Sequence, residues 1–325
     1  RMHPLIHAYA RERLAERTAT ELETNIRFEN TIIGRMITYF INYAENNKER
    51  PNMLDMERDN LLQAAQWAHN NGAWSNIHAL WENLDEWLDG IGDLRNKSQL
   101  VEWAIESNEK LERPAELSKV LCSHSTQLSL MGRSIDAKQS AEKALELARQ
   151  SEDRKSIVLA LTELGRILQE DFKQLVEGHD LFEKAWDVCK EISDWDQVAY
   201  VAYMLANSFE SLGKLTEAAE WEKTSLEIAQ KTKSLRFEAF AVTAIGRRLA
   251  QRGQLDEAYE YLMRSQKLRE QVENKDCVAI NLHALAHLEQ RRNNASDARE
   301  LFEKAIIIYE ELHTYRSLAG TLREI

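Results

Sequence analysis

The chain has 325 residues, of which 30% are charged, and 42 basic against 54 acidic side chains give it a net charge of −12. This acidic balance argues against nucleic acid as a direct partner, because binding to a phosphate backbone needs clustered Lys and Arg side chains that displace counterions. With 11 Gly and 3 Pro the chain has few residues that interrupt helices, so we expect an all-α protein.

Hydropathy and cysteine content bear on the cellular location of the protein. No stretch approaches the roughly 20 consecutive apolar residues that a helix needs to cross a bilayer, so no membrane partner is expected. The three cysteines, Cys122, Cys189 and Cys277, are far apart and odd in number, and each lies inside a helical pattern. Buried, reduced thiols and a cytoplasmic location follow as predictions.

Two segments precede the regular part of the chain. Residues 2–16 (MHPLIHAYARERLAE) form an amphipathic helical pattern that is too short to be a domain. Residues 20–48 form one long helical pattern, which should end before Pro51 because proline biases its predecessor out of the helix. We assign 1–17 to the end of a preceding domain and 18–53 to a linker helix.

A single spacing organises the remainder. Six markers lie 40, 41, 40, 40 and 40 residues apart, and each ends one apolar helical pattern just before another begins: Gly92, Gly132, Lys173, Gly213, Gly253 and Asn293. Glycine tolerates the left-handed backbone of a helix stop, and Asn is the next best residue for it. Lys173 departs from this rule, beside one inserted residue. Such a period is typical of a stack of helical hairpins.

Small side chains recur at two further positions of the period. Seven residues before the markers, or eight in the third repeat with its one inserted residue, stand Asp85, Ser125, Gly165, Ala206, Gly246 and Ala286. Five residues after the markers stand Lys97, Ala137, Gly178, Ala218, Ala258 and Ala298. Because small side chains let helices pack closely, we expect these positions to form the seam within each hairpin. The predicted solenoid covers 54–325, with a half-repeat at 54–72, six repeats over 73–313, and the start of a cap or further repeat at 315–325.

The repeat resembles a known family. The stretches 205–229 (LANSFESLGKLTEAAEWEKTSLEIA) and 245–265 (IGRRLAQRGQLDEAYEYLMRS) look like tetratricopeptide repeats, whose mark is a Leu-small pair, a Gly about seven residues later and an Ala at the hairpin seam. His124, where an apolar residue is usual, departs from this pattern. The resemblance implies a right-handed superhelix of helical hairpins, an α-solenoid whose concave groove holds a ligand.

A second resemblance concerns the N-terminal part. Residues 2–16 are similar to the end of the winged-helix domain of signal-transducing ATPases of the STAND/NB-ARC type, and 58–72 (RDNLLQAAQWAHNNG) resembles the start of the repeat domain in bacterial regulators of that class. The resemblance implies a ligand-sensing and autoinhibitory arm, whose partner is the protein's own upstream nucleotide-binding domain. The alternative is a free-standing adaptor that docks a peptide or protein.

No catalytic or cofactor motif accompanies the repeats. The chain lacks a Gly-x-x-x-x-Gly-Lys loop, so any ATPase activity would lie upstream. Cys122 and His124 are two residues apart and point in different directions on a helix. His283 and His287 have the i, i+4 spacing of a metal pair, but HALAH lacks the Glu of a zinc peptidase and no third ligand can be named. We therefore predict no enzyme, no cofactor and no metal site.

The family resemblance also implies a binding face. In this family the first helix of each repeat lines the concave groove, which gives the candidates Arg166, Tyr203, Asn207, Arg247, His283, His287 and Arg291. Arg side chains can grip carboxylate or phosphate by two parallel hydrogen bonds. The amide of Asn207 can both donate and accept, so it can clamp the backbone of an extended peptide. The expected occupant is a peptide, protein or small-molecule effector; the alternative is a polar groove wall without a specific ligand.

Overall fold

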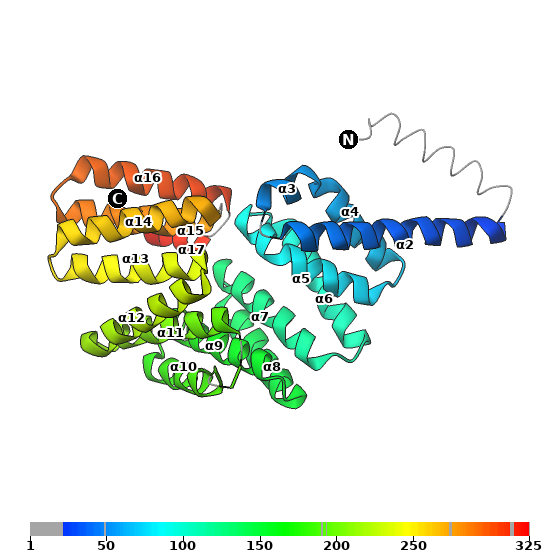
Figure 1. Ribbon diagram of the computed structural model, residues 1–325, viewed down its shortest axis with the longest axis horizontal. Helices are drawn as coiled ribbons and strands as arrows, with labels where there is room; N and C mark the ends of the chain where they lie inside the picture. The colour runs from blue at the N-terminus through cyan, green and yellow to red at the C-terminus, as the bar shows by residue number, and fades with distance from the viewer. Residues whose placement is uncertain are drawn as a thin grey trace. The chain divides into compact units, whose positions relative to one another are not determined.

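The computed structural model describes residues 22–48, 50–189, 191–192, 194–272, 275–312 and 315–324. Every regular element in these ranges is an α-helix (Figure 1). The predicted winged-helix remnant at 1–17 lies outside them. Contacts between Cα atoms divide the chain into two compact units, Arg1–Leu84 and Asp85–Ile325, and each is described by itself.

The first unit contains the predicted linker. Its helices are α2 (Leu22–Asn47), α3 (Pro51–Met56), α4 (Arg58–Asn70) and most of α5 (Trp74–Gly90). Pro51 opens α3, and Arg50 before it has a non-helical φ of −131°, as proline requires. The predicted linker helix is not extended in isolation, because α2 packs along α4 and buries Ile37, Phe40 and Ala44.

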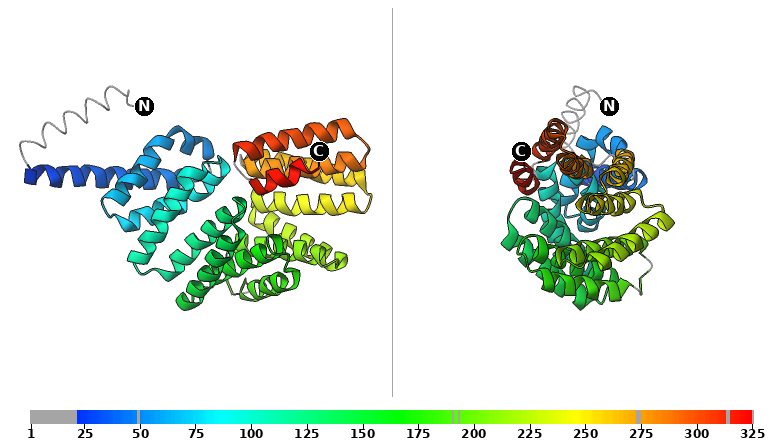
Figure 2. Two further views of the ribbon diagram at one scale, coloured as in Figure 1. Left: turned by 180° about the vertical axis from the view of Figure 1, so that it is seen from behind. Right: turned by 90° about the vertical axis from the view of Figure 1, so that its left-hand side faces the viewer.

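The second unit is a succession of helical hairpins (Figures 1 and 2). Its helices after α5 are α6 (Leu94–Lys110), α7 (Pro114–Leu130), α8 (Ser134–Ser151), α9 (Arg154–Glu170), α10 (Leu175–Cys189), α11 (Trp195–Ser211), α12 (Leu215–Thr232), α13 (Leu235–Gln251), α14 (Leu255–Val272), α15 (Lys275–Arg291), α16 (Ala295–Glu311) and α17 (Tyr315–Leu322). The most extensive packing joins consecutive pairs, α7 with α8 through α15 with α16. The predicted α-helical solenoid is therefore confirmed.

The backbone turns carry the predicted period. All six markers have a positive φ: Gly92 70°, Gly132 77°, Lys173 58°, Gly213 76°, Gly253 81° and Asn293 62°. The departure at Lys173 is thus one of residue type and not of backbone, since Lys173 adopts the same left-handed stop as the glycines. Turns between successive hairpins use this conformation too, at Gly72, Glu112, Glu152 and Lys233.

The predicted seam is tightest in the third and fifth repeats. A Cβ atom added at Gly178 would lie 2.8 Å from the carbonyl oxygen of Gly165, and one added at Gly165 would lie 2.7 Å from Cε1 of Phe182. In the fifth repeat a Cβ at Gly246 would lie 3.3 Å from the carbonyl oxygen of Ala258. Glycine is present because the two backbones of each hairpin approach too closely for a larger residue.

The seam of the first repeat has a buried ion pair in place of small residues. Lys97 is 1% exposed and pairs with Asp89, and its Nζ lies 3.5 Å from Asp85. The hydroxyl of Ser123 donates to both carboxylate oxygens of Asp85 at 2.9 and 2.7 Å. Burial raises the pKa of Asp85 against the opposing effect of Lys97. Burial alone would lower the pKa of Lys97, but the two carboxylates outweigh it and raise that pKa.

Candidate ligand-binding wall

The first helices of the hairpins form the inner side of the stack. Contacts join successive first helices: α7 to α9, α9 to α11, α11 to α13 and α13 to α15. Among the described residues, no comparable contact joins one second helix to the next in the series α8, α10, α12, α14 and α16. In a curved stack, successive helices approach most closely on the concave side. We call the exposed and half-buried side chains on this side of α9, α11, α13 and α15 the inner wall.

Aromatic side chains gather on the inner wall between α11 and α13. We call the following half-buried residues the aromatic patch: Tyr200, Tyr203, Phe237 and Phe240. Ring centroids of Tyr200 and Phe237 lie 5.8 Å apart, and those of Tyr203 and Phe240 lie 5.5 Å apart. The guanidinium carbon of Arg236 lies 5.8 Å from the Phe237 ring centroid. Rings at these spacings hold one another in place and form a half-buried apolar surface.

The sequence prediction found only part of this patch. Tyr203 was a predicted site residue, whereas Phe237 was missed. The signal for it was present, because Phe237 precedes Phe240 by three residues and so shares its helix face.

Two predicted site residues meet beside the patch. Nη2 of Arg247 donates to Oδ1 of Asn207 at 3.3 Å, which links α13 to α11 across one repeat. Arg247 is exposed, and no carboxylate of a described residue lies within ion-pair distance of it. The Asn207 amide nitrogen is left to donate elsewhere, since no hydrogen bond from it to another described residue forms. This pair therefore offers a cation and an amide donor to a ligand.

Further polar contacts repeat at the same spacing. Gln251 donates to Glu210 at 2.8 Å, and the predicted site residue Arg291 donates through Nη1 to the carbonyl oxygen of Ala250 at 3.1 Å. These bonds tie successive first helices together, so the inner wall is ordered before any ligand arrives.

Arg166 is placed differently from what the sequence suggested. Its guanidinium donates to Glu163 at 2.7 and 3.0 Å and to Glu170 at 2.9 Å, and its side chain is 11% exposed. Burial would lower the pKa of Arg166, but the two carboxylates outweigh burial and raise it well above its usual value. Its charge is neutralised within α9, so Arg166 supports the inner wall and offers little to a ligand.

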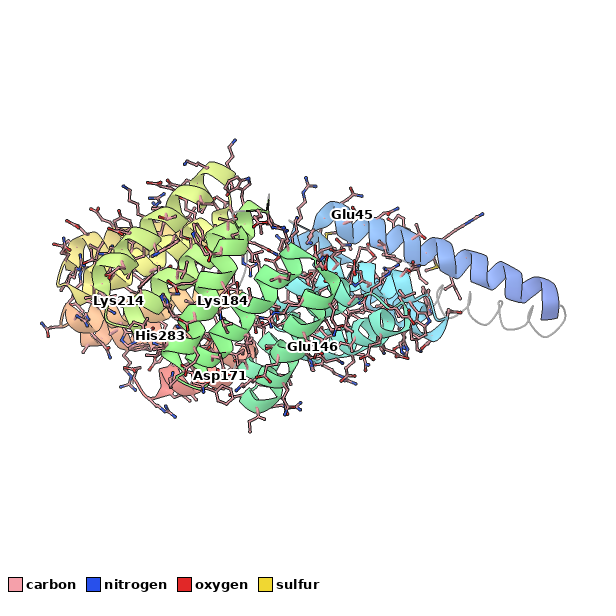
Figure 3. The ribbon with its side chains drawn as sticks, turned by 90° about the horizontal axis from the view of Figure 1, so that it is seen from below. Glu45, Glu146, Asp171, Lys184, Lys214 and His283 are labelled. Carbon is pink, nitrogen blue, oxygen red and sulfur yellow. The ribbon has the colours of Figure 1, made fainter. Side chains whose placement is uncertain are left out.

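His283 and His287 lie together at the far end of the inner wall (His283 is labelled in Figure 3). Their Nε2 atoms are 2.8 Å apart, and both rings meet the Phe302 ring edge-on, with centroids 5.4 and 5.3 Å away. Burial, followed by the neighbouring His287, lowers the pKa of His283 to about 4. Among the described residues no group of three or more His, Cys, Asp or Glu side chains could hold a metal ion.

The cysteines behave as predicted. Cys122, Cys189 and Cys277 are buried, and no disulfide joins any two of them. Burial raises the pKa of the Cys122 thiol well above its usual value and that of Cys189 to about 12. Thiols in this state are poor nucleophiles. Separately, no helix in the described part of the chain combines the length and hydropathy that a bilayer span requires.

The comparisons with known proteins agree with this geometry. The family profile "Tetratricopeptide repeat" matches residues 239–311, which span most of α13 and all of α14 to α16 as far as Glu311. The fold is that of a tetratricopeptide-repeat solenoid. No curated protein matches its sequence.

Several solved structures share the tetratricopeptide fold. A Rap protein complexed with Competence and Sporulation Factor superposes with a TM-score of 0.64 at 15% identity, covering 96% of this chain and 92% of its own. The Rap conjugation gene regulator of the plasmid pLS20, in complex with the Phr* peptide, gives 0.62 at 16% identity, covering 85% and 74%. The apo form of RapI gives 0.63 at 10% identity, covering 85% and 98%. At these identities the likeness extends to the fold alone.

Proposed function

We propose that this solenoid binds a peptide, or an extended segment of a protein, against its inner wall. The observation that carries the proposal is the adjacency of the aromatic patch to the Asn207–Arg247 pair on two neighbouring helices. Two structures of the same fold were solved with a factor or peptide bound, which supports a peptide as the class of ligand.

The spacing along α13 defines the ligand more closely. Phe240 and Arg247 are seven residues apart, which is about 10 Å along a helix. An extended peptide advances about 3.3 Å per residue, so about three residues span this distance. We therefore expect an apolar side chain in the aromatic patch and, about three residues away, a side-chain or C-terminal carboxylate on Arg247. The Asn207 amide donates to the backbone between them.

The consequence of binding depends on what the solenoid is joined to. As the sensor and autoinhibitory arm of a STAND-type ATPase, it would shift an equilibrium between closed and open forms, which requires different ligand affinity in the two. As a free-standing protein, it would dock its partner without that switch. A phosphate-binding loop encoded upstream of Arg1 would support the first, and a start codon near Met2 the second.

A selection experiment tests the binding site. Random peptides displayed on phage are selected against the chain, and the affinity of the enriched peptide is measured by calorimetry. We expect Asn207→Ala combined with Arg247→Glu to lower that affinity at least tenfold without changing the unfolding temperature, because both side chains lie at the surface of the inner wall. The matched control is Arg299→Glu on the second helix α16, where the Arg side chain is 70% exposed. If the double variant and the control bind the enriched peptide with equal affinity, the peptide does not bind at Asn207 and Arg247.

A further inference from the structure

The His283–His287 pair is held in a fixed geometry from several sides. The two residues are one helical turn apart on α15, and their ring centroids lie 4.7 Å apart at an interplanar angle of 31°. Phe302 of α16 packs edge-on against both rings. Their Nδ1 atoms point to hydrogen-bond partners, Thr321 of α17 for His283 and Gln290 of α15 for His287.

Those partners determine which nitrogen of each ring carries the proton. The Thr321 hydroxyl donates its single proton to the carbonyl oxygen of Ser317 at 2.9 Å, so it must accept from Nδ1 of His283 at 3.1 Å. Gln290 donates through Nε2 to the carbonyl oxygen of Glu324 at 3.3 Å, which directs its Oε1 to Nδ1 of His287 at 3.2 Å. Each neutral ring therefore carries its proton on Nδ1 and an unshared electron pair on Nε2.

Two unshared electron pairs then face each other across 2.8 Å, an arrangement that a cation between them would stabilise. We propose that His283 and His287 chelate a divalent transition-metal ion through their two Nε2 atoms. The hydrogen bonds from Nδ1 to Thr321 and Gln290 are the kind that orients histidine ligands in metal sites.

The nitrogen spacing selects the class of metal. With metal–nitrogen bonds of about 2.0 Å, nitrogens 2.8 Å apart subtend an angle near 90° at the ion. That is the angle between neighbouring ligands in square-planar or octahedral complexes, so the spacing fits Cu²⁺ or Ni²⁺ better than tetrahedral Zn²⁺. Water or a carboxylate completes the coordination. Glu324, whose negative charge acts on His283, favours the ion, whereas the positive charge of Arg247 opposes it.

Metal titration of the untagged chain tests this site. His3 and His7 share the same spacing and are first replaced by Gln, so that only one such pair remains. The chain is stripped with a chelator and titrated calorimetrically with NiCl2, and with CuSO4 while the visible absorption of copper–imidazole complexes is followed. We expect one ion per chain and an affinity at least tenfold lower in His287→Gln. His69→Gln, at a half-buried histidine on α4 with no second histidine four residues away, serves as the matched control and should bind as before.

A second variant tests the tautomer argument. Thr321→Val keeps the volume of a fully buried side chain but removes the acceptor for Nδ1 of His283, so metal affinity should fall roughly ten- to a hundredfold. Thermal unfolding without metal checks that each variant is folded, and His283→Gln replaces His287→Gln if the latter is not. The proposal is overturned if the parent chain binds no stoichiometric ion, if His287→Gln binds as tightly as His69→Gln, or if Thr321→Val leaves the affinity unchanged.

Discussion

Replacing Gly178 by Ala should destabilise the third hairpin. The new Cβ would lie 2.8 Å from the carbonyl oxygen of Gly165 and would overlap Cγ of Gln169. Gln169 cannot move aside freely, because its Nε2 donates to the carbonyl oxygen of Leu175 at 2.8 Å and to Oγ of Ser208 at 2.6 Å. Overpacking costs about 1–3 kcal/mol, and an unmet buried hydrogen bond costs about as much again. The helix propensity of Ala returns only about 1 kcal/mol. The expected net loss is therefore about 1–5 kcal/mol.

The assay is urea unfolding followed by circular dichroism, in the parent and in matched glycine variants. At Gly34 in α2 and Gly320 in α17, an added Cβ would have no heavy atom within 4 Å apart from adjacent residues and the nearby backbone of its own helix. Ala at either position should therefore stabilise the chain, by up to about 1 kcal/mol. The change in the free energy of unfolding should thus be a loss for Gly178→Ala and a gain for the two control substitutions. Gly178→Ala unfolding at the same or a higher urea concentration than the parent would refute the close approach of α9 and α10.

Three other predictions concern buried or hydrogen-bonded side chains. Lys97→Met should cost about 3 kcal/mol in urea unfolding, because it leaves the Asp85 carboxylate, which is only 20% exposed, without its buried cation. Lys97→Ala with Asp85→Ala, which introduces the small residues of other repeats, should recover much of that loss. Asp153→Ala should cost about 1 kcal/mol, since the carboxylate accepts from the backbone N–H and hydroxyl of Ser156. Those hydrogen bonds outweigh burial and lower the pKa of Asp153 in the folded chain. The stabilisation that Asp153 provides is therefore fully present above the usual pKa of an aspartate, and it is lost as the pH falls through the lowered pKa. The raised pKa of Cys122 predicts slow reaction with a disulfide reagent at pH 8 until urea unfolds the chain.

Features that depend on local backbone were predictable from sequence. Gly213 and Gly253 marked left-handed helix stops because glycine occupies that conformation at little cost. Lys173 was expected to depart from this rule, but its backbone adopts the same left-handed stop. The alignment also located Asp85 and Lys97 at the seam. The alignment of the repeats does not show which side chains meet, so the ion pair between Asp85 and Lys97 is known only from the structure.

Features that depend on a side chain's partners were harder to predict. Arg166 was predicted to bind a ligand through its positive charge. Glu163 and Glu170 stand three residues before and four residues after it on the same helix, and both pair with its guanidinium. The proton positions on His283 could not be anticipated, because Thr321, which determines them, lies 38 residues away in the sequence. Sequence spacing identifies which residues share a helix face, but it does not identify the partner each one already has.

Photo-crosslinking tests most directly whether the ligand lies on the inner wall. The peptide enriched from the phage library is synthesised with a photoreactive group in place of its apolar side chain, and the crosslinked residues are mapped by mass spectrometry. The account predicts crosslinks to the aromatic patch, at Tyr203 and Phe240 on α11 and α13. Crosslinks confined to second helices, such as those around the exposed Lys223 on α12, would contradict it.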